Sequence, residues 1–319
     1  MPLFIEGGTL VNLEDEPWVL DRWTVFFMYR KMETSTGSPY VFMGWSTVYR
    51  YFLYQVATPP SSPQKSKRLL DFKLPLPEQP LSQFPCRSRI SQFIILPPFQ
   101  KQGHGARFYD AIFDYYLEAP QTVEITVEDP NEAFDDLRDL NDLIRIRKLL
   151  ADTPDRIKIN TSTKIPRKGV VPTGKIVDLA VIDKMRTELK IAPRQMSRLV
   201  EMYLLAKISP SVRLTLHDIP KLKKTSELEG EKHKYHLWQL LVKQRLYKHN
   251  RDQLAQLDLV ERIDKLDQAL AGVEADYARL LRAIDEKHDT AQDIGSKRAA
   301  EDDGDIGEPA AKKSRVESE

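Results

Sequence analysis

Cysteine is almost absent from this sequence, which has only Cys86 among its 319 residues. A single thiol cannot form an intrachain disulfide or supply a Cys-rich zinc site, and it fits a reducing compartment. Long apolar runs are also missing, because none approaches the roughly 20 residues of a membrane span. The N-terminus lacks the basic segment followed by an apolar stretch that marks a secretory signal. These absences predict a soluble intracellular protein.

Charge of one sign is not in excess either. The 48 Lys and Arg residues against 47 Asp and Glu residues leave a formal net charge of +1. This balance argues against a protein that coats nucleic acid through its net charge, so a charged partner must meet a local patch. We expect no direct contact with nucleic acid or membrane. The length predicts two domains plus tails, at roughly 100–200 residues per domain.

The N-terminal part has the composition of strands. Residues 23–30 and 41–54 are dense in β-branched and aromatic side chains, and residues 33–39 between them have turn chemistry, which predicts a long antiparallel hairpin. Residues 55–90 differ, because prolines recur there among serines and lysines. Proline removes a backbone donor and breaks helices, so this stretch is predicted to be a surface insertion rather than a binding loop, with Cys86 inside it.

The middle of the chain alternates between strand and helix patterns. The expected order is a buried strand, a glycine loop, a helix with apolar residues at helical spacing, a second strand and a second helix, at residues 91–96, 100–105, 106–118, 122–127 and 134–150. From about residue 173 to 289 the pattern is helical. In the last helix, one apolar stripe predicts a packing face, formed by Val273, Tyr277, Leu280 and Ile284.

The glycine loop at residues 100–105 is the sharpest local feature. Its two glycines allow a tight turn with amide groups facing one point, and the helix that follows presents unpaired N–H groups. Together they suit a phosphate or pyrophosphate, although an ordinary glycine turn remains the alternative. The loop lacks the Gly-Lys-Ser/Thr of a Walker loop and the third glycine of the dinucleotide fingerprint. His104 has no second His or Cys at metal spacing, so we predict no metal.

Two carboxylates follow the second strand directly. Glu128 and Asp129 stand at the strand end, where a carboxylate with a raised pKa could act as a general base. The alternative is a helix N-cap, because Asp before Pro130 is a common way to open a helix. That alternative is expected for Asp129 and does not explain Glu128.

Several segments resemble a known family. FIILPPFQKQGHGARFYDAIFDYY and VEITVEDPNEAFDDLRD are similar to the catalytic subunits of type B histone acetyltransferases, acetyl-CoA-dependent N-acetyltransferases related to the Gcn-five enzyme. Residues 100–105 match the Q/R-x-x-G-x-G/A motif of that superfamily, and residues 128–130 and 137–139 point to the type B family. FIEGGTLVN, EPWVLDRW and GWSTVYRYFLY look like its upstream segments, so the resemblance covers about residues 3–54 and 90–290.

The resemblance implies a role for each residue of the expected site. Glu128 would be the general base, with Glu6 and Asp129 as further acidic positions near the acceptor lysine. Contacts with acetyl-CoA would come from Phe93, Ile94, Ile95, Gln100, Lys101, Gln102, Gly103, His104, Gly105, Ala106 and Asn131. The histone groove would be lined by Trp18, Tyr49, Arg50 and Tyr51. For each aromatic residue, packing within the fold is the alternative.

The resemblance also implies a fold and a reaction. The fold class is α/β (α+β): a mixed, mostly antiparallel sheet of the acetyl-CoA N-acetyltransferase type, followed by a helical C-terminal domain. We expect the acetyltransferase core at residues 1–150, the helical domain at 151–290 and a disordered tail at 291–319. We expect the family's separate N-terminal domain to be absent. Cys86 lies outside every motif, so an acyl-cysteine intermediate is not expected.

The implied activity is direct transfer of acetyl from acetyl-CoA to a lysine ε-amine of free, newly made histone, the H-four tail. The implied partner is a WD-repeat histone chaperone subunit. The alternatives are an N-acetyltransferase with a non-histone amine acceptor and a truncated, inactive histone-binding scaffold. Basic clusters at residues 297–298 and 312–315 predict a nuclear import signal, with a solvated tail as the alternative. The expected location is nucleus and cytoplasm.

Overall fold

The computed structural model describes residues 17–32, 37–53, 84–165, 172–213 and 226–302. Their side chains are described except at 17–18, 226–227 and 287–302. The predicted acidic position Glu6, most of the proline-rich stretch and the end of the tail therefore lie outside the described residues, as does the side chain of Trp18.

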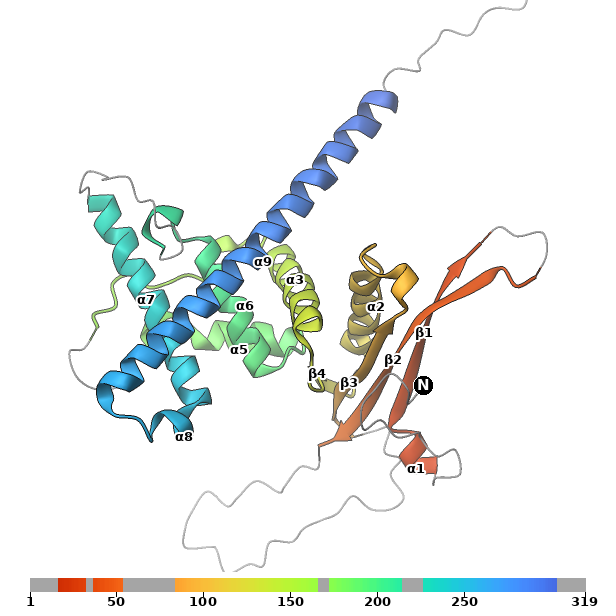
Figure 1. Ribbon diagram of the computed structural model, residues 1–319, viewed down its shortest axis with the longest axis horizontal. Coiled ribbons are helices and arrows are strands. Elements are labelled where there is room, and N and C mark those ends of the chain that lie inside the picture. The colour runs from red at the N-terminus through yellow and green to blue at the C-terminus, as the bar shows by residue number, and fades with distance from the viewer. Residues whose placement is uncertain (1–16, 33–36, 54–83, 166–171, 214–225, 303–319) are drawn as a thin grey trace, which may run out of the picture.

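Four strands form one sheet in the order β1-β2-β3-β4, with bounds Trp23–Lys31, Tyr40–Phe52, Cys86–Ile95 and Thr122–Val127 (Figure 1). The pairs β1–β2 and β2–β3 are antiparallel, while β3–β4 is parallel. The parallel pair requires a crossover, which the helix between these strands provides. The predicted fold class, a mixed and mostly antiparallel sheet followed by helices, is confirmed.

Strand β3 begins earlier than predicted. Residues 86–90 were assigned to the insertion, and this assignment is wrong because they pair with both β2 and β4. Cys86, Ser88 and Ile90 are each at most 1% exposed, so they point into the core. Arg87 and Arg89, which alternate with them, point to the other face of the sheet. The hydroxyls of Ser88 and Thr122, 2.9 Å apart, join β3 to β4 inside that core.

Helices α2 (His104–Glu118) and α3 (Glu132–Leu149) pack against the sheet. In α2, buried residues recur at helical spacing, at Phe108, Tyr109, Ile112, Phe113 and Tyr116. The rings of Phe93 on β3 and Phe134 on α3 lie 5.0 Å apart, and Phe93 also contacts Phe108. Both predicted helices are present, each starting two residues earlier than expected.

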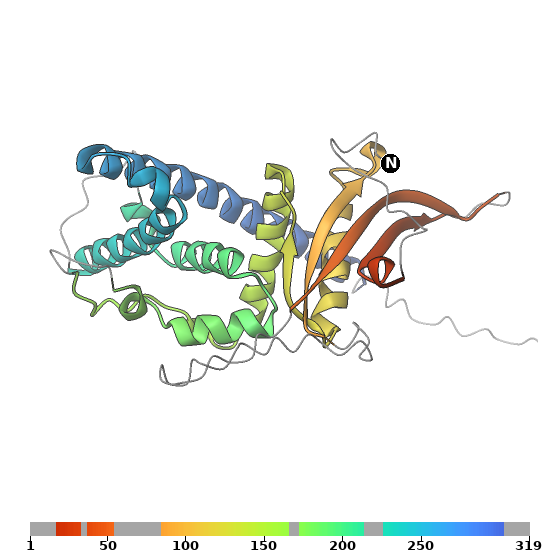
Figure 2. The ribbon, with the colours of Figure 1, turned by 90° about the horizontal axis from the view of Figure 1, so that it is seen from below.

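The remaining helices form a second layer beside α3 (Figures 1 and 2). They are α4 (Thr173–Ile176), α5 (Leu179–Glu188), α6 (Pro193–Ala206), α7 (Ser226–His249), α8 (Arg251–Leu254) and α9 (Leu259–Asp302). Short elements complete the described chain: α1 (Pro17–Leu20), η4 (Pro97–Phe99), η5 (Pro154–Arg156) and η6 (Pro210–Val212). The predicted packing stripe of the last helix is confirmed, because Tyr277, Leu280 and Ile284 are at most 5% exposed.

The helical layer is joined to the sheet through backbone and side chains. Ile191 forms a parallel bridge with Ile125 of β4. The amide of Gln195 on α6 donates to Asp139 and Asp142 of α3, at 2.8 and 3.1 Å. The division into domains at residue 150 stays a prediction.

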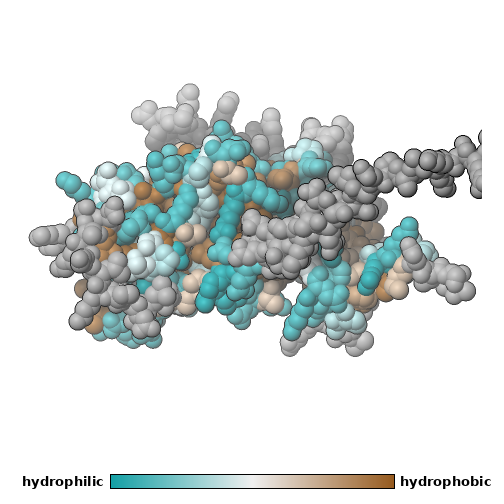
Figure 3. Space-filling view, turned by 90° about the horizontal axis from the view of Figure 1, so that it is seen from above, coloured by the Kyte–Doolittle hydropathy of each residue, from teal (hydrophilic) through white to brown (hydrophobic). Residues whose placement is uncertain are grey.

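The face seen in Figure 3 is mostly hydrophilic, with small hydrophobic areas between polar side chains. Among the helices in the described part of the chain, none combines the length and hydropathy needed to cross a bilayer.

Candidate functional site

The site begins where β3 and β4 separate. β4 pairs with β3 only along residues 86–90, and the N–H of Glu128 donates to the carbonyl of Ile90 at 2.9 Å as the chain leaves the sheet. The rest of β3, residues 91–95, has no partner strand on this side within the described chain. An extended ligand could therefore add to this open edge through backbone hydrogen bonds.

Alternation decides which residues face the open edge. Leu96 donates its N–H to Met43 on the β2 side, at 2.8 Å, so Ile95 and Phe93 direct their peptide groups away from β2. The carbonyl of Ile95 accepts a hydrogen bond from the Gln100 side chain, at 2.8 Å, which leaves its N–H at the edge.

Ile94 was predicted to share the edge, and the structure does not bring it there. Its carbonyl oxygen faces β2 so closely that a Cβ on Gly44 would lie 2.2 Å from it. Gly44 is thus required by the close approach of two backbones.

The glycine loop turns the chain from β3 into α2. Lys101 and Gly103 have left-handed backbone conformations, with φ of 58° and 77°. Gly103 is the N-cap of α2 and offers no side-chain cap, so the first N–H groups of the helix remain available to an anion. A Cβ on Gly103 would meet no atom within 4 Å, so the space beside this residue is open.

Gly105, also predicted to contact the cofactor, lies at a close contact between two helices. A Cβ there would lie 2.9 Å from Cδ1 of Leu137 on α3, which is the movable tip of a side chain, so α2 and α3 approach closely at this residue. The loop also has positive charge. Lys101 and Arg107 are exposed, and the Arg107 guanidinium lies 2.8 Å from Nδ1 of His104. Across the described residues, no group of three or more His, Cys, Asp or Glu side chains is arranged to hold a metal ion.

The predicted N-cap at Asp129 is wrong. The N-cap of α3 is Asn131, whose side chain accepts a hydrogen bond from the N–H of Phe134 at 2.9 Å. Asp129 has a φ of 35° and forms the turn between β4 and the helix. Asn131 was predicted to lie near the cofactor, and its position between Glu128 and α3 is compatible with that role.

Glu128 lies at the open edge with its side chain 41% exposed. Its carboxylate is 3.5 Å from a guanidinium nitrogen of Arg89, and Arg89 donates to the hydroxyl of Tyr51 at 3.0 Å. Glu128, which directly follows β4, is thereby connected in one row with side chains of β3 and β2. Sequence reasoning missed Arg89 because it fell in the assigned insertion, although the alternation of Arg87 and Arg89 with buried residues is a strand signal.

Tyr49 and Tyr51 share the sheet face on which this row lies. Their rings are 4.7 Å apart, and Arg22 donates to the hydroxyl of Tyr49 at 3.0 Å. Arg50 was grouped with them, but it points to the opposite face, where its guanidinium lies 3.5 Å from the hydroxyl of Thr24. The structure therefore brings together the two tyrosines and Glu128, without Arg50.

Cys86 lacks the properties of a catalytic thiol. Its side chain is buried in the sheet, and burial raises the pKa of the thiol above its ordinary value. A buried, protonated thiol is a poor nucleophile.

Comparisons with known proteins show the family of this chain. A family model described as the C-terminal region of fungal HAT1 matches residues 155–209. Proteins named histone acetyltransferase type B catalytic subunit are 44% identical over 99% of this chain in Gibberella zeae, 45% over 99% in Pyricularia oryzae and 42% over 92% in Neurospora crassa. The chain spans 66%, 65% and 60% of the length of these relatives. The chain belongs to the family of histone acetyltransferase type B catalytic subunits.

Proposed function

We propose that this protein transfers acetyl from acetyl-CoA to a lysine ε-amine of free histone, at the tail of histone H-four. The observation that supports the proposal most directly is the convergence of three features. The open edge of β3 runs from Ile90, where Glu128 leaves the sheet, to Ile95, beside which the uncapped α2 starts.

The residues around the open edge fit acetyl-CoA. Backbone groups of Phe93 and Ile95 suit the amides of the pantetheine arm, which is itself an extended chain. The N–H groups that start α2, with Lys101 and Arg107 beside them, suit the pyrophosphate. When bound, acetyl-CoA supplies an acetyl group that is already activated as a thioester.

Glu128 is the proposed general base. A free lysine has a pKa of about 10.4, so only roughly one amine in 10³ is neutral at pH 7. Preparing the neutral amine adds on the order of 4–5 kcal/mol to the barrier. The exposed carboxylate of Glu128 can accept this proton, directly or through a water, while Arg89 orients it.

Tyr49 and Tyr51 are the proposed binding surface for the acceptor lysine. Tyr49 and Tyr51 form an aromatic surface that leads toward Glu128, along which the stem of a lysine can lie. Asp129, next to Glu128, and Glu6 are the proposed further acidic positions.

The test is acetyl transfer from acetyl-CoA to a histone H-four tail peptide. Glu128→Gln should lower kcat by about 10²–10⁴-fold with little change in acetyl-CoA affinity, because the amide keeps the shape and loses the basicity. The matched control is Glu124→Gln, which removes a carboxylate of β4 that is paired with Arg87 at 3.2 Å. If Glu128→Gln keeps more than about half of kcat while chemistry limits the rate, Glu128 is not the base. Acetylation of other amines in preference to the histone peptide would reject the histone substrate.

We also propose a partner and a location. The name shared by the relatives, catalytic subunit, suggests a companion subunit, and a WD-repeat histone chaperone is the proposed one. We propose that the protein acts on newly made histones in the cytoplasm and in the nucleus. Co-purification of a tagged chain with a WD-repeat protein from the source cells tests the first, and imaging of the tagged chain tests the second.

A further inference from the structure

Strand β1 forms the outer edge of the sheet, on the side away from the helical layer (Figures 1 and 2). The carbonyl of Arg22 and the N–H of Met32 both form hydrogen bonds on the β2 side, at 2.8 and 2.7 Å. Because successive residues of a strand face opposite neighbours, the odd-numbered residues of β1 direct their peptide groups outward. Within the described chain, no strand pairs with this outer edge.

The residues that face outward also have exposed apolar side chains. Val25, Phe27 and Tyr29 are each about half exposed, and alternation places all three on one face of β1. The strand has nine residues and no proline, and a long edge strand with exposed apolar side chains is normally covered. This edge therefore has the properties of an interface.

A groove of about 840 Å³ lies between β1 and α2. Its floor is apolar, formed by side chains of β1, β2 and α2: Phe26, Met28, Met43, Phe108 and Ile112. At one end, the ring of Tyr115 lies 5.3 Å from the ring of Phe26. Proteins bind extended peptides at such places, because the strand edge supplies backbone hydrogen bonds and the groove receives alternate side chains of the peptide.

The other end of the groove is cationic. β1 is parallel to β3, and α2 returns the chain from β3 to the parallel strand β4, so α2 runs antiparallel to β1. At about 3.3 Å per residue along β1 and about 1.5 Å per residue along α2, Arg30 and Arg107 both lie roughly 12–13 Å from the aromatic contact. No Asp or Glu lines the groove, and neither arginine forms an ion pair with a described carboxylate.

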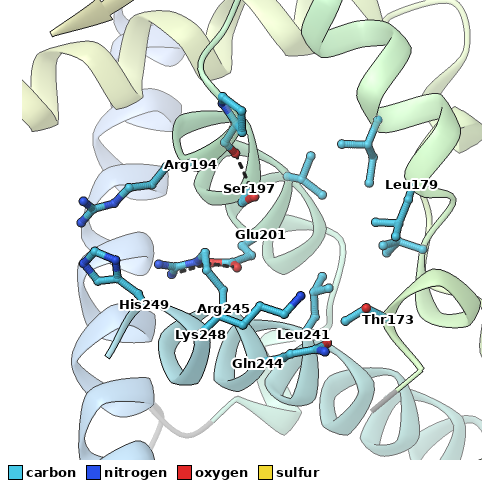
Figure 4. A pocket seen from close by; sticks show the side chains of 14 residues that line it. Thr173, Leu179, Arg194, Ser197, Glu201, Leu241, Gln244, Arg245, Lys248 and His249 are labelled. Atoms are coloured by element: carbon cyan, nitrogen blue, oxygen red, sulfur yellow. Dashed lines mark hydrogen bonds and ion pairs between the residues drawn. The ribbon is translucent and has the colours of Figure 1, made fainter. Parts of the chain in front are cut away.

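The cavity of about 450 Å³ among the C-terminal helices differs from this groove (Figure 4). Its lining residues come from α4 to α7 and from the α4–α5 connection, so no strand edge reaches it. Both oxygens of the buried Glu201 accept hydrogen bonds from Arg245 there, at 2.7 and 2.8 Å, and neutralise its charge. The groove beside β1 instead combines an open strand edge with arginines that lack a carboxylate partner.

We propose that β1 and α2 form a docking surface for an extended segment of a partner protein, apolar at alternate positions and acidic at one end. The segment would pair with the outward N–H and C=O groups of β1. Its apolar side chains would lie against Phe26 and Met28, and its acidic side chain would lie toward Arg30 and Arg107. These cations would repel a lysine-rich histone tail, so the segment is not the proposed substrate.

Binding of the peptide Asp-Thr-Val-Thr-Ile-Thr, blocked at both ends, to the full chain tests the proposal. Every second residue of this peptide suits the groove, with one carboxylate followed by two apolar side chains. Fluorescence anisotropy of the labelled peptide should show saturable binding, and Lys in place of Asp should weaken it roughly tenfold, because a charge-assisted hydrogen bond is lost. N-methylation of two successive central residues should abolish binding, since one of the two N–H groups must face β1. Absence of saturable binding, or equal binding of either altered peptide, would overturn the proposal.

Amide hydrogen exchange gives a direct measure of strand addition. The outward N–H groups of Val25, Phe27 and Tyr29 should exchange roughly tenfold more slowly when the peptide is bound. Those of Thr24 and Phe26, which already face β2, should change little. Equal protection of both sets would overturn strand addition. Protection of the outward set without peptide, together with a dimer in sedimentation equilibrium, would assign the edge to a second copy of the chain and overturn the proposed occupant.

One pair of variants locates the acidic end of the segment. Arg30 and Lys31 are neighbours on β1 with side chains on opposite faces, and of the two only Arg30 lines the groove. Arg30→Glu should weaken peptide binding by about tenfold or more, while Lys31→Glu should have less than about a threefold effect. Equal effects would refute this location. Acetyl-CoA affinity should be unchanged in both variants, and displacement of the peptide by acetyl-CoA would assign the groove to the cofactor and overturn the proposal.

Discussion

Replacement of single glycines by alanine separates backbone strain from cofactor contact in the α2 loop. Gly103 and Gly37 both have left-handed backbones, with φ of 77° and 96°, and a Cβ on either would meet no protein atom within 4 Å. The two positions therefore differ chiefly in location. Gly103 starts α2 beside the open edge of β3, while Gly37 precedes β2 in the connection from β1.

The magnitudes follow from this comparison. An L-residue held in the left-handed region costs about 1–2 kcal/mol, so Gly37→Ala and Gly103→Ala should each lower the free energy of unfolding by about that amount. Gly105→Ala should differ, because its Cβ displaces only the tip of Leu137 while alanine gains about 1 kcal/mol of helix propensity. Its stability should be nearly unchanged.

Acetyl-CoA affinity should respond to one of the three variants. A methyl group at residue 103 fills the space in front of the α2 amides, and loss of one hydrogen bond to a charged group costs about 1.5–3 kcal/mol. Gly103→Ala should therefore weaken acetyl-CoA binding by about 10- to 100-fold, with Gly37→Ala as the strain-matched control. Urea unfolding and calorimetric titration measure the two quantities. Wild-type affinity in Gly103→Ala, or an equal loss in Gly37→Ala, would refute the assigned pyrophosphate site.

Three further predictions concern other parts of the chain. Arg89→Met should lower kcat about tenfold at constant acetyl-CoA affinity, and Arg89→Lys should restore part of it. Arg87→Met, which breaks the equivalent pair with Glu124, is the control. An equal loss of kcat in Arg87→Met would reject a positioning role for Arg89. Burial raises the pKa of Asp142 to about 7, so the folded state holds this proton more tightly than the unfolded state, and stability should fall as pH rises from about 4 to 7 by at most roughly 4 kcal/mol. Urea unfolding across this range should show that slope in the wild type and not in Asp142→Asn; an unchanged slope would contradict it. Alanine at Lys312, Lys313 and Arg315 should reduce nuclear accumulation of a tagged chain without affecting peptide acetylation, and unchanged nuclear levels would exclude an import role.

The elements that the sequence predicts well are those with a strong local period. The spacing of buried residues in α2 and the dense β-branched and aromatic composition of β1 and β2 are properties of a few consecutive residues, and all three elements are present near the expected bounds. The prediction was wrong at the start of β3. The prolines up to Pro85 led to assignment of residues 86–90 to the insertion, although buried and exposed residues alternate from Cys86 onward.

The parts of the site that were missed depend on contacts between distant residues. The role of Gly105 depends on Leu137, and the row that contains Glu128 depends on Arg89 and Tyr51, which lie on two other strands. No local period specifies which strand will supply a partner for a carboxylate. The side on which Arg50 points could have been predicted, because successive residues of a strand point to opposite faces and the prediction grouped Arg50 with Tyr49 and Tyr51 without applying this rule.

The position of the site follows from the unequal lengths of two parallel strands. β4 ends at Val127 while β3 continues to Ile95, and the left-handed turn at Asp129 directs the chain away from the sheet. Pairing beyond Ile90 would bury the backbone groups of Phe93 and Ile95, so the early end of β4 is what leaves an edge for a ligand. The same turn holds Glu128 beside the last shared hydrogen bond, at the place where that edge opens. The proposed cofactor edge along β3 and the proposed base at the end of β4 would therefore both follow from one backbone feature.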